Sequence, residues 1–360
     1  MPSRKNQHFV PQFYLRHFSA DKKTVSLFLK KDERLLNCVP IKTQCSKDYF
    51  YPDLQYEESL GKFEEQCQHI INRVIGGRSA LLSNAERFWL RAFVILQRNR
   101  TEQEAQNLLK SFGDMCDYLK SIGMSKEARR EAEGFPNNEK EAVELITSLF
   151  GKGMEMTADI KCKVLRYNGK GAFLTSDDPV VMYNPFLEHH GKPNYGLSAI
   201  GLLLLLPLSE SHAVVLYDGD TYKIGNRKDQ VVSFDSAQDL YWMNLLTYLN
   251  ANNAVYFKPG TNDIHTIMSL AQTAKAIGQS KQTKFETFLA EDGQSELLHS
   301  YDQNFYIGAE FSFIKTLDKA RGFKLGDTIS VTDYSRPYCN ALYMSSFPDP
   351  PVPAMRYKPK

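Results

Sequence analysis

The N-terminal segment 6–18 combines an imidazole, an amide and a guanidinium among large apolar residues. Pro11 favours an extended backbone before it and a helical turn after it. In such a turn Gln12 and Arg16 share one face, and His8 lies just before the turn. Histidine titrates near physiological pH, so we predict His8 as a general base or acid, with Gln12 and Arg16 binding a polar or anionic substrate. The alternative is a terminus held in the core, with His8 hydrogen-bonded to backbone.

A second polar cluster, Thr175-Ser176-Asp177-Asp178-Pro179, lies between two apolar segments. Loops that leave strands often carry functional residues on a rigid scaffold. We predict Asp177 as a catalytic residue that polarises His8, or Asp177 and Asp178 as ligands of Mg²⁺ or Mn²⁺, which prefer oxygen. Neighbouring side chains of an extended chain point apart, so Asp177 is the preferred ligand of the two. Side chains that bond nearby backbone in a turn are the structural alternative.

The third cluster, Gln97-Arg98-Asn99-Arg100, comes directly after the apolar stretch 88–96. The arginine fork matches phosphate or carboxylate in a bidentate manner. We therefore predict that Gln97, Arg98 and Arg100 bind an anion. The favourable interaction of cations with a helix C-terminus accounts for the arginines equally well.

Other polar patterns favour simpler readings. Glu57-Glu58 and Glu64-Glu65 fit the solvated face of an amphipathic helix. His189-His190 has no third metal ligand at a suitable spacing. The sequence contains no Gly-x-Ser-x-Gly elbow, no phosphate-binding loop and no dinucleotide fingerprint, which argues against the enzyme classes built on them.

The elements that must position these residues predict an α+β fold. Hydrophobic periods of three to four residues, with capping patterns at Ser83 and Thr101, predict a mainly helical part over 58–150. Short apolar runs separated by turn residues predict a β-rich part over 156–257 that packs against the helical half. Together with residues 1–57 these parts form a main domain, 1–257, and residues 258–360 form a C-terminal extension of unknown role.

The predicted elements have the following limits. Strands are expected at 24–29, 38–41, 160–167, 173–174, 180–182, 202–206, 214–217 and 254–257. Helices are expected at 58–76, 83–96, 101–121, 139–150, 236–250 and 262–278, and the Pro-rich tail 347–353 is expected to be irregular.

Composition indicates an ordered protein without a membrane segment. The chain has 360 residues, 42% of them hydrophobic, and a net charge of +2, but residues 1–50 carry ten Lys or Arg against four Asp or Glu. The six cysteines form no Cys-x-x-Cys pair, so we expect neither zinc nor disulfides. The longest apolar run, 202–206, is too short to span a bilayer, and no signal region is visible, so we expect a cytoplasmic protein.

Five segments of the chain carry a family resemblance. They are His8-x-Val10-Pro11-Gln12-Phe13-Tyr14-Leu15-Arg16-x-Phe18; Asp48-Tyr49-Phe50-Tyr51 with Leu60-x-x-Phe63-Glu64; Gln97-Arg98-x-Arg100; Phe173 to Val180; and Pro207-Leu208-Ser209 ahead of Asn244. Together they resemble the largely bacterial family called domain of unknown function 4238, over about residues 5–257, and the resemblance implies an architecture but no activity. That family often has a second arginine further along its helical motif, whereas this chain reads Arg98-Asn99-Arg100-Thr101-Glu102.

From these observations we predict a phosphodiester- or nucleotide-directed hydrolase. His8, Gln12, Arg100 and Asp177 would converge in one cleft between the helical and the β-rich halves, as base, substrate binders and metal or water positioner. Nucleic acid or a nucleotide is the expected partner because the basic excess lies on the segment that carries His8. The resemblance to a bacterial family without assigned chemistry is compatible with a nuclease effector in defence, or a toxin.

Two alternatives remain open at this point. A non-catalytic module that binds nucleic acid or another anion predicts a basic groove lined by aromatic rings such as Tyr14 or Tyr51. A structural or interaction protein predicts that the motif residues are buried and bonded to backbone, with no shared cavity.

Overall fold

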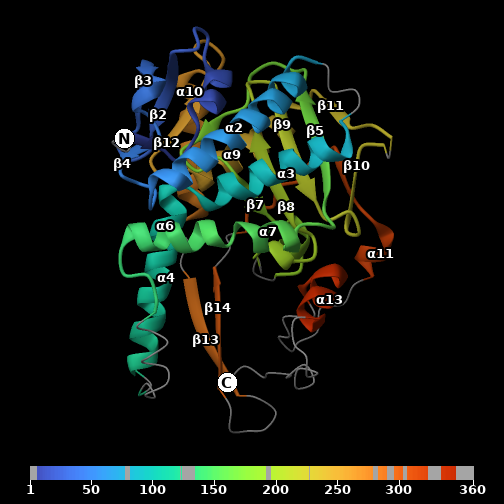
Figure 1. The fold of residues 1–360 in the computed structure, drawn as a ribbon. Helices are drawn as coiled ribbons and strands as arrows, with labels where there is room; N and C mark the ends of the chain where they lie inside the picture. Colours follow the sequence, from blue (N-terminus) through green and yellow to red (C-terminus); the bar gives the residue numbers. More distant parts are fainter. Residues whose placement is uncertain are drawn as a thin grey trace.

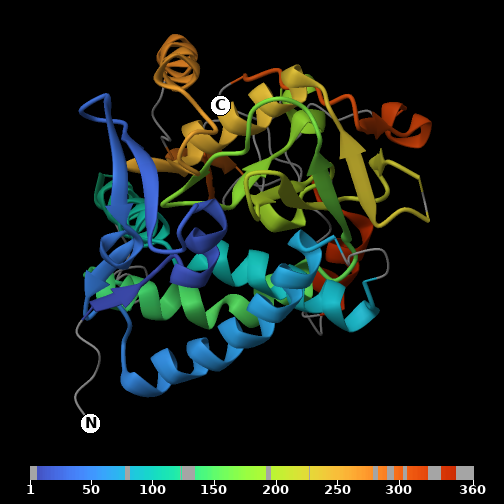
Figure 2. The same ribbon diagram turned by 90° about the horizontal axis from the view of Figure 1, so that it is seen from above.

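The structure is a computed structural model that describes residues 6–77, 82–121, 123, 134–191, 196–226, 228–278, 283–289, 296–302, 306–322 and 334–345. It confirms the α+β fold, with helices concentrated in the N-terminal half and sheets in the C-terminal half. Helices α2 and α3 lie across one face of a central sheet, and α9 lies on the other (Figures 1 and 2). The predicted Pro-rich tail falls outside the described residues.

The helices and strands have these bounds. The N-terminal part contains β1 (Asn6–His8), α1 (Gln12–Leu15), β2 (Thr24–Leu29), β3 (Arg34–Pro40), β4 (Ser46–Asp48), α2 (Leu54–Ile75), α3 (Asn84–Asn99), α4 (Glu102–Ser121), α6 (Glu139–Ser148) and α7 (Phe150–Met156). The β-rich part contains β5 (Lys161–Tyr167), β6 (Thr175–Ser176), β7 (Val181–Tyr183), α8 (Pro185–His189), β8 (Leu203–Pro207), β9 (His212–Tyr217), β10 (Tyr222–Ile224), β11 (Val231–Phe234), α9 (Ala237–Asn250) and β12 (Ala254–Phe257). The extension contains α10 (Ile264–Ile277), β13 (Thr283–Leu289), β14 (Glu296–Asp302), β15 (Ile314–Thr316), α11 (Asp318–Arg321) and α13 (Pro337–Ser345).

Local capping explains where the long helices begin. Asp53 accepts a hydrogen bond from the backbone N–H of Tyr56 at 2.7 Å, so α2 begins four residues before the predicted start. The predicted capping box of Ser83 and Glu86 is present at the start of α3. The start of α3, the helix that carries Gln97 and Arg98, is therefore fixed by its own sequence.

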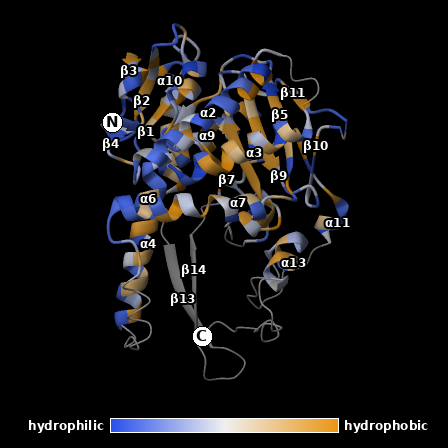
Figure 3. Ribbon diagram, in the orientation of Figure 1, coloured by the Kyte–Doolittle hydropathy of each residue, from blue (hydrophilic) through white to orange (hydrophobic). Residues whose placement is uncertain are grey.

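The central sheet has the strand order β11-β5-β9-β8-β7, and only the β11–β5 pair is parallel. Alternate residues point to opposite faces, and both faces are buried. Leu204 and Leu206 join the core beneath α3, whereas Leu203 and Leu205 join the core that includes α9. This two-sided burial explains the unbroken leucine run, and Figure 3 shows the mainly hydrophobic character of the labelled strands β5 and β9.

A second, four-stranded sheet has the order β3-β2-β12-β6 and is antiparallel throughout. Its strand β12 joins the N-terminal hairpin of β2 and β3 to the β-rich part. The loop between β6 and β7 connects the two sheets and contains Asp177 and Asp178. No helix of the described segments is long and apolar enough to cross a membrane.

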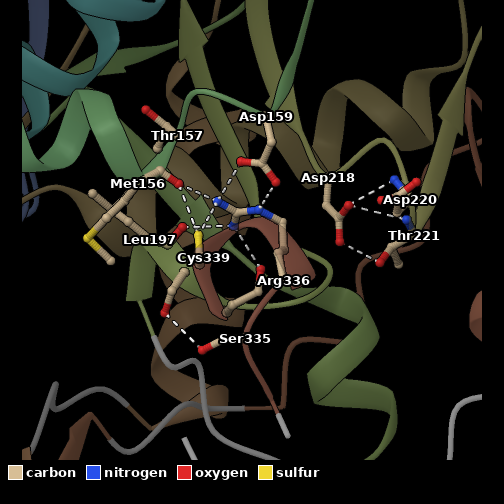
Figure 4. A network of polar contacts seen from close by, with 12 residues as sticks. Met156, Thr157, Asp159, Leu197, Asp218, Asp220, Thr221, Ser335, Arg336 and Cys339 are labelled. Atoms are coloured by element: carbon tan, nitrogen blue, oxygen red, sulfur yellow. Dashed lines mark hydrogen bonds and ion pairs between the residues drawn. The ribbon is translucent and has the colours of Figure 1, made fainter. Parts of the chain in front are cut away.

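The C-terminal extension packs against the main domain at several places. Helix α10 shares an apolar cluster with α9, and β15 pairs with β10. The Arg336 side chain, 1% exposed, donates to Asp159 Oδ2 at 2.8 Å and to the Leu197 carbonyl at 2.8 Å (Figure 4). A buried guanidinium requires partners for its donors, so this network ties α13 to the loop before β5.

Candidate functional site

The N-terminal motif links the helical part to both sheets. Strand β1 pairs with β4, and a short helix follows Pro11 as predicted. Tyr14 is fully buried; its hydroxyl donates to the Pro207 carbonyl at 2.6 Å and hydrogen-bonds with Thr175 Oγ1, also at 2.6 Å. Burial raises the pKa of Tyr14. This ring therefore does not line a groove, and its role is to join motif segments that are far apart in the sequence.

His8 is half-buried, and its Nε2 atom lies 3.2 Å from the Lys42 carbonyl. A carbonyl only accepts, so Nε2 carries the proton and the lone pair resides on Nδ1. Burial lowers the pKa of His8, the Lys42 bond and the Glu64 carboxylate raise it, and the charge of Arg16 lowers it. Arg16 donates to Gln12 Oε1 at 3.4 Å, which confirms that these two exposed or half-buried side chains share a face.

The predicted anion binder Arg100 is occupied inside the protein. Its side chain is fully buried and donates to Glu64 Oε1 at 2.7 Å and to Gln97 Oε1 at 2.9 Å. Gln97 in turn donates to the Phe9 carbonyl at 3.0 Å. The geometry thus points to a structural role for Arg100 and Gln97. Glu64 was expected on a solvated face; its side chain is 26% exposed, and it is also the ion-pair partner of a buried arginine, a role that the sequence did not predict.

Gln7 and Tyr51 complete this buried polar network. Gln7 donates to Glu57 Oε2 at 3.1 Å and accepts from the backbone N–H of Tyr51 at 2.7 Å. The Tyr51 hydroxyl donates to the His8 carbonyl at 3.0 Å. Tyr51 is buried, so it does not provide the groove-lining ring that a nucleic-acid module predicts.

Asp177 is fixed by backbone. Its Oδ1 accepts from the N–H of Asn252 at 2.9 Å, and its Oδ2 accepts from those of Asn253 at 2.7 Å and Ala254 at 3.2 Å. Burial raises the pKa of Asp177, whereas these three bonds lower it. Both oxygens face N–H donors, which carry partial positive charge, so the arrangement does not fit a cation.

Asp178 is also buried, and its Oδ1 accepts from Thr101 Oγ1 at 3.4 Å. This contact joins the β6–β7 loop to the start of α4. Across the described segments, no group of three or more His, Cys, Asp or Glu side chains could hold a metal ion. Of the four residues predicted to converge, Arg100 bonds to Glu64, whose carboxylate also raises the pKa of His8. Gln12 bonds to Arg16, and Asp177 bonds to the backbone of residues 252–254.

Two large clefts lie outside this network. One, of about 990 Å³, is bordered by α4, β7 and α9 and is lined by Arg98, which is 22% exposed. We name it the interlayer cleft. It lies between the helical and β-rich halves, where a cleft was predicted, but of the predicted site residues it takes only Arg98.

The second cleft, of about 870 Å³, lies between α3 and the strands β5 and β10. Five cations and one carboxylate, Asp229, line it. Within the described chain none of these cations forms an ion pair with a carboxylate. We name it the cationic cleft; its cations are Arg87, Arg91, Lys161, Lys163 and Lys223.

An exposed aromatic ring lies at the α3 wall of the cationic cleft. Phe88 is 49% exposed, and the Arg91 guanidinium lies 5.5 Å from its ring centroid. Arg91 Nη1 donates to the Thr157 carbonyl at 2.9 Å, and its buried Nε has no hydrogen-bond partner in the part of the chain that is described. Burial lowers the pKa of Arg91 and of Lys163. The Lys163 ammonium donates to the carbonyls of Asn226 and Asp229, so part of its charge is met by backbone oxygens. Cations without carboxylate partners beside an open ring suit an anionic, aromatic ligand.

Residues 6–261 match the family DUF4238, described as a protein of unknown function. The chain belongs to this family. The DUF4238 region includes all the predicted site residues and both clefts except Ile307 and Leu317. The chain matches no curated protein and no solved structure.

The cationic cleft was missed by sequence reasoning, although local signals of it exist in the DUF4238 region. Arg87 and Arg91 are four residues apart on α3 and share a face, and Lys161 and Lys163 lie on the same side of β5. Nothing in the local sequence indicates that these two pairs meet, because α3 and β5 are brought together only by the packed fold.

Proposed function

We propose that the protein binds single-stranded nucleic acid in the cationic cleft. The observation that carries this proposal is the set of five cations that lack carboxylate partners among the described residues. Holding like charges together is unfavourable unless an anion neutralises them. This is the non-catalytic alternative drawn from the sequence, at a different location.

A single strand fits this cleft better than a duplex. Its phosphates bind cations along a groove, and its unpaired bases stack on exposed rings, at about 1–3 kcal/mol per base. Phe88 supplies such a ring beside Arg91. Tyr217 and Tyr222 also line the cleft, but both are buried, so Phe88 is the ring we expect to stack on a base. Gly219 and Gly225 line the same space.

We expect Lys161→Glu and Lys223→Glu each to weaken binding of a fluorescein-labelled 12-nucleotide single strand by about tenfold or more. Both side chains are exposed in the cleft, and each substitution replaces an attractive charge with a repulsive one. The slope of log Kd against log salt concentration should decrease by about 0.7 for each phosphate contact removed. Fluorescence anisotropy at several salt concentrations measures both quantities.

Lys31→Glu is the matched control, because Lys31 is exposed on the β2–β3 turn and does not line the cleft. It changes net charge equally and should leave binding nearly unchanged. If Lys31→Glu weakened binding as much as the two cleft variants do, overall charge alone would explain the loss of affinity. That result would contradict the proposal.

Hydrolysis of a nucleotide or phosphodiester at His8 is a second candidate. One observation favours it: the Lys42 bond leaves Nδ1 as the basic atom, and burial lowers the pKa of His8, which favours the neutral ring that a base requires. A general base typically contributes about 10²–10⁴-fold to a rate. We expect His8→Gln to lower the cleavage rate of labelled DNA, RNA or nucleotide by that factor, assayed with Mg²⁺, Mn²⁺ or a chelator.

His69→Gln is the control for this test, since His69 is exposed on α2. Both variants should melt near the wild-type temperature, because each loses at most one partly exposed hydrogen bond. Cleavage that persists unchanged in His8→Gln would exclude His8 as the base. Nucleic-acid binding in the cationic cleft would then be the remaining candidate function.

A further inference from the structure

Strand β7 forms one edge of the central sheet. It pairs with β8 through Val181, Met182 and Tyr183, and no other described strand pairs with it. The outer side of an edge strand presents backbone N–H and C=O groups that can accept another strand. This edge is not covered by a further strand of the described chain, and it borders the interlayer cleft.

The interlayer cleft follows this edge along its whole length. All three residues of β7 line it, together with the flanking Val180 and Asn184. Leu246 and Leu249 of α9 provide an apolar part of the lining. Space of about 990 Å³ beside an open strand edge suits an extended peptide segment, since alternate side chains of such a segment need pockets on either side.

The opposite wall of the cleft offers groups that match peptide bonds. Gln103, Gln106 and Asn107 of α4 all line it, and Gln103 donates to Asn107 Oδ1 at 2.6 Å. A carboxamide both donates and accepts hydrogen bonds, as a peptide group does. A peptide between the two walls could therefore bond to β7 on one edge and to these carboxamides on the other.

The charges in the cleft favour an acidic occupant. Arg98, Lys110 and Lys152 line it, and the last two are exposed. Of its two carboxylates, Glu188 already accepts from the Tyr183 hydroxyl and from the Gly308 N–H at 3.2 Å. Glu104, the other lining carboxylate, lies 4.0 Å from Arg98, and Lys152 pairs with Glu155 at 2.8 Å. With Lys30, the lining holds four cations against two carboxylates, so positive charge predominates.

We propose that the interlayer cleft binds an extended acidic peptide, which adds to β7 as an antiparallel or parallel sixth strand of the sheet. The backbone of β7 supplies the main-chain bonds, the carboxamides of α4 bond to the second edge, and Arg98 and Lys110 pair with the carboxylates. This site is separate from the cationic cleft, so peptide binding here does not depend on nucleic-acid binding there.

The test uses a fluorescein-labelled, end-blocked octapeptide of alternating glutamate and valine with the full-length chain. We expect micromolar binding by anisotropy and slower amide exchange over 181–183 when the peptide is added. N-methylation of alternate residues removes the donors of one edge, and it should weaken binding at least tenfold. Absence of binding at millimolar peptide, or equal binding of the methylated peptides, would overturn the proposal.

Charge variants locate the peptide in the cleft. Lys110→Glu should weaken binding at least fivefold, whereas Lys120→Glu should leave it unchanged, because Lys120 is 68% exposed on the same helix and does not line the cleft. Both substitutions are on exposed side chains, so folding should be retained. An alternating lysine and valine peptide that binds as tightly as the acidic one would also overturn the proposal.

Discussion

Arg100→Met is expected to lower the free energy of unfolding by about 3–5 kcal/mol, the usual cost of removing one partner from a buried ion pair. The side chain is fully buried, and its loss leaves Glu64 Oε1 and Gln97 Oε1 without the donors at 2.7 and 2.9 Å. The contact of Gln97 with the Phe9 carbonyl should weaken with it. Urea unfolding followed by circular dichroism measures the change.

Arg98→Met is the matched control for this prediction. Arg98 lies two residues earlier at the same helix end and is 22% exposed. Its Nη2 atom lies 4.0 Å from the Glu104 carboxylate. Its loss should cost less than about 1 kcal/mol, as for a solvent-exposed pair. If Arg100→Met is as stable as Arg98→Met, Arg100 does not stabilise the fold. The prediction that Arg100 binds an anion would then again explain this residue.

Asp177→Ala is expected to lower the free energy of unfolding by more than about 3 kcal/mol. Three backbone N–H groups, those of Asn252, Asn253 and Ala254, would lose their acceptor, and a buried donor left unsatisfied costs about 1–3 kcal/mol. Asp177→Asn keeps one oxygen but turns an amide N–H₂ toward donors, so it should be destabilised less than alanine. Thermal and urea unfolding in parallel give the order of the variants.

Asp32→Ala provides the comparison, since Asp32 is exposed on the β2–β3 turn. It should unfold at nearly the wild-type urea concentration. A fully stable Asp177→Ala would contradict the structural role and would restore Asp177 as a ligand for Mg²⁺ or Mn²⁺.

Much of the fold was predictable because its signals are local. Hydrophobic period and capping predicted α2, α3, α4 and α9, and the Ser83 capping box is present as expected. The predicted ends of the strands were less accurate. The strand expected at 38–41 is β3, Arg34–Pro40, and its pairing with β2 shifts register at a bulge between Val25 and Leu27 of β2. Bulges and pairing register depend on neighbouring strands, and no local pattern specifies them.

The roles of the motif residues were harder to predict than their importance. The sequence predicted that His8, Gln12, Arg100 and Asp177 converge in one cleft. Asp177 instead accepts from the backbone of residues 252–254. The sequence also gave no sign that Glu64, whose side chain is 26% exposed, pairs with the buried Arg100. Glu64 lies on α2 at a position that helical periodicity assigns to solvent. A partner 36 residues away in the chain decides its environment, and only the packed structure supplies it.

We propose that the motif residues hold the fold while nucleic acid binds in the cationic cleft. Photo-crosslinking of a single-stranded oligonucleotide that contains 4-thiouridine, followed by mass spectrometry of the crosslinked peptides, distinguishes the two locations. We expect crosslinks within residues 84–91 and 217–226, two segments that contribute to the lining of the cleft. Crosslinks confined to residues 6–18 or 97–100 would contradict it and would place the ligand at the motifs instead.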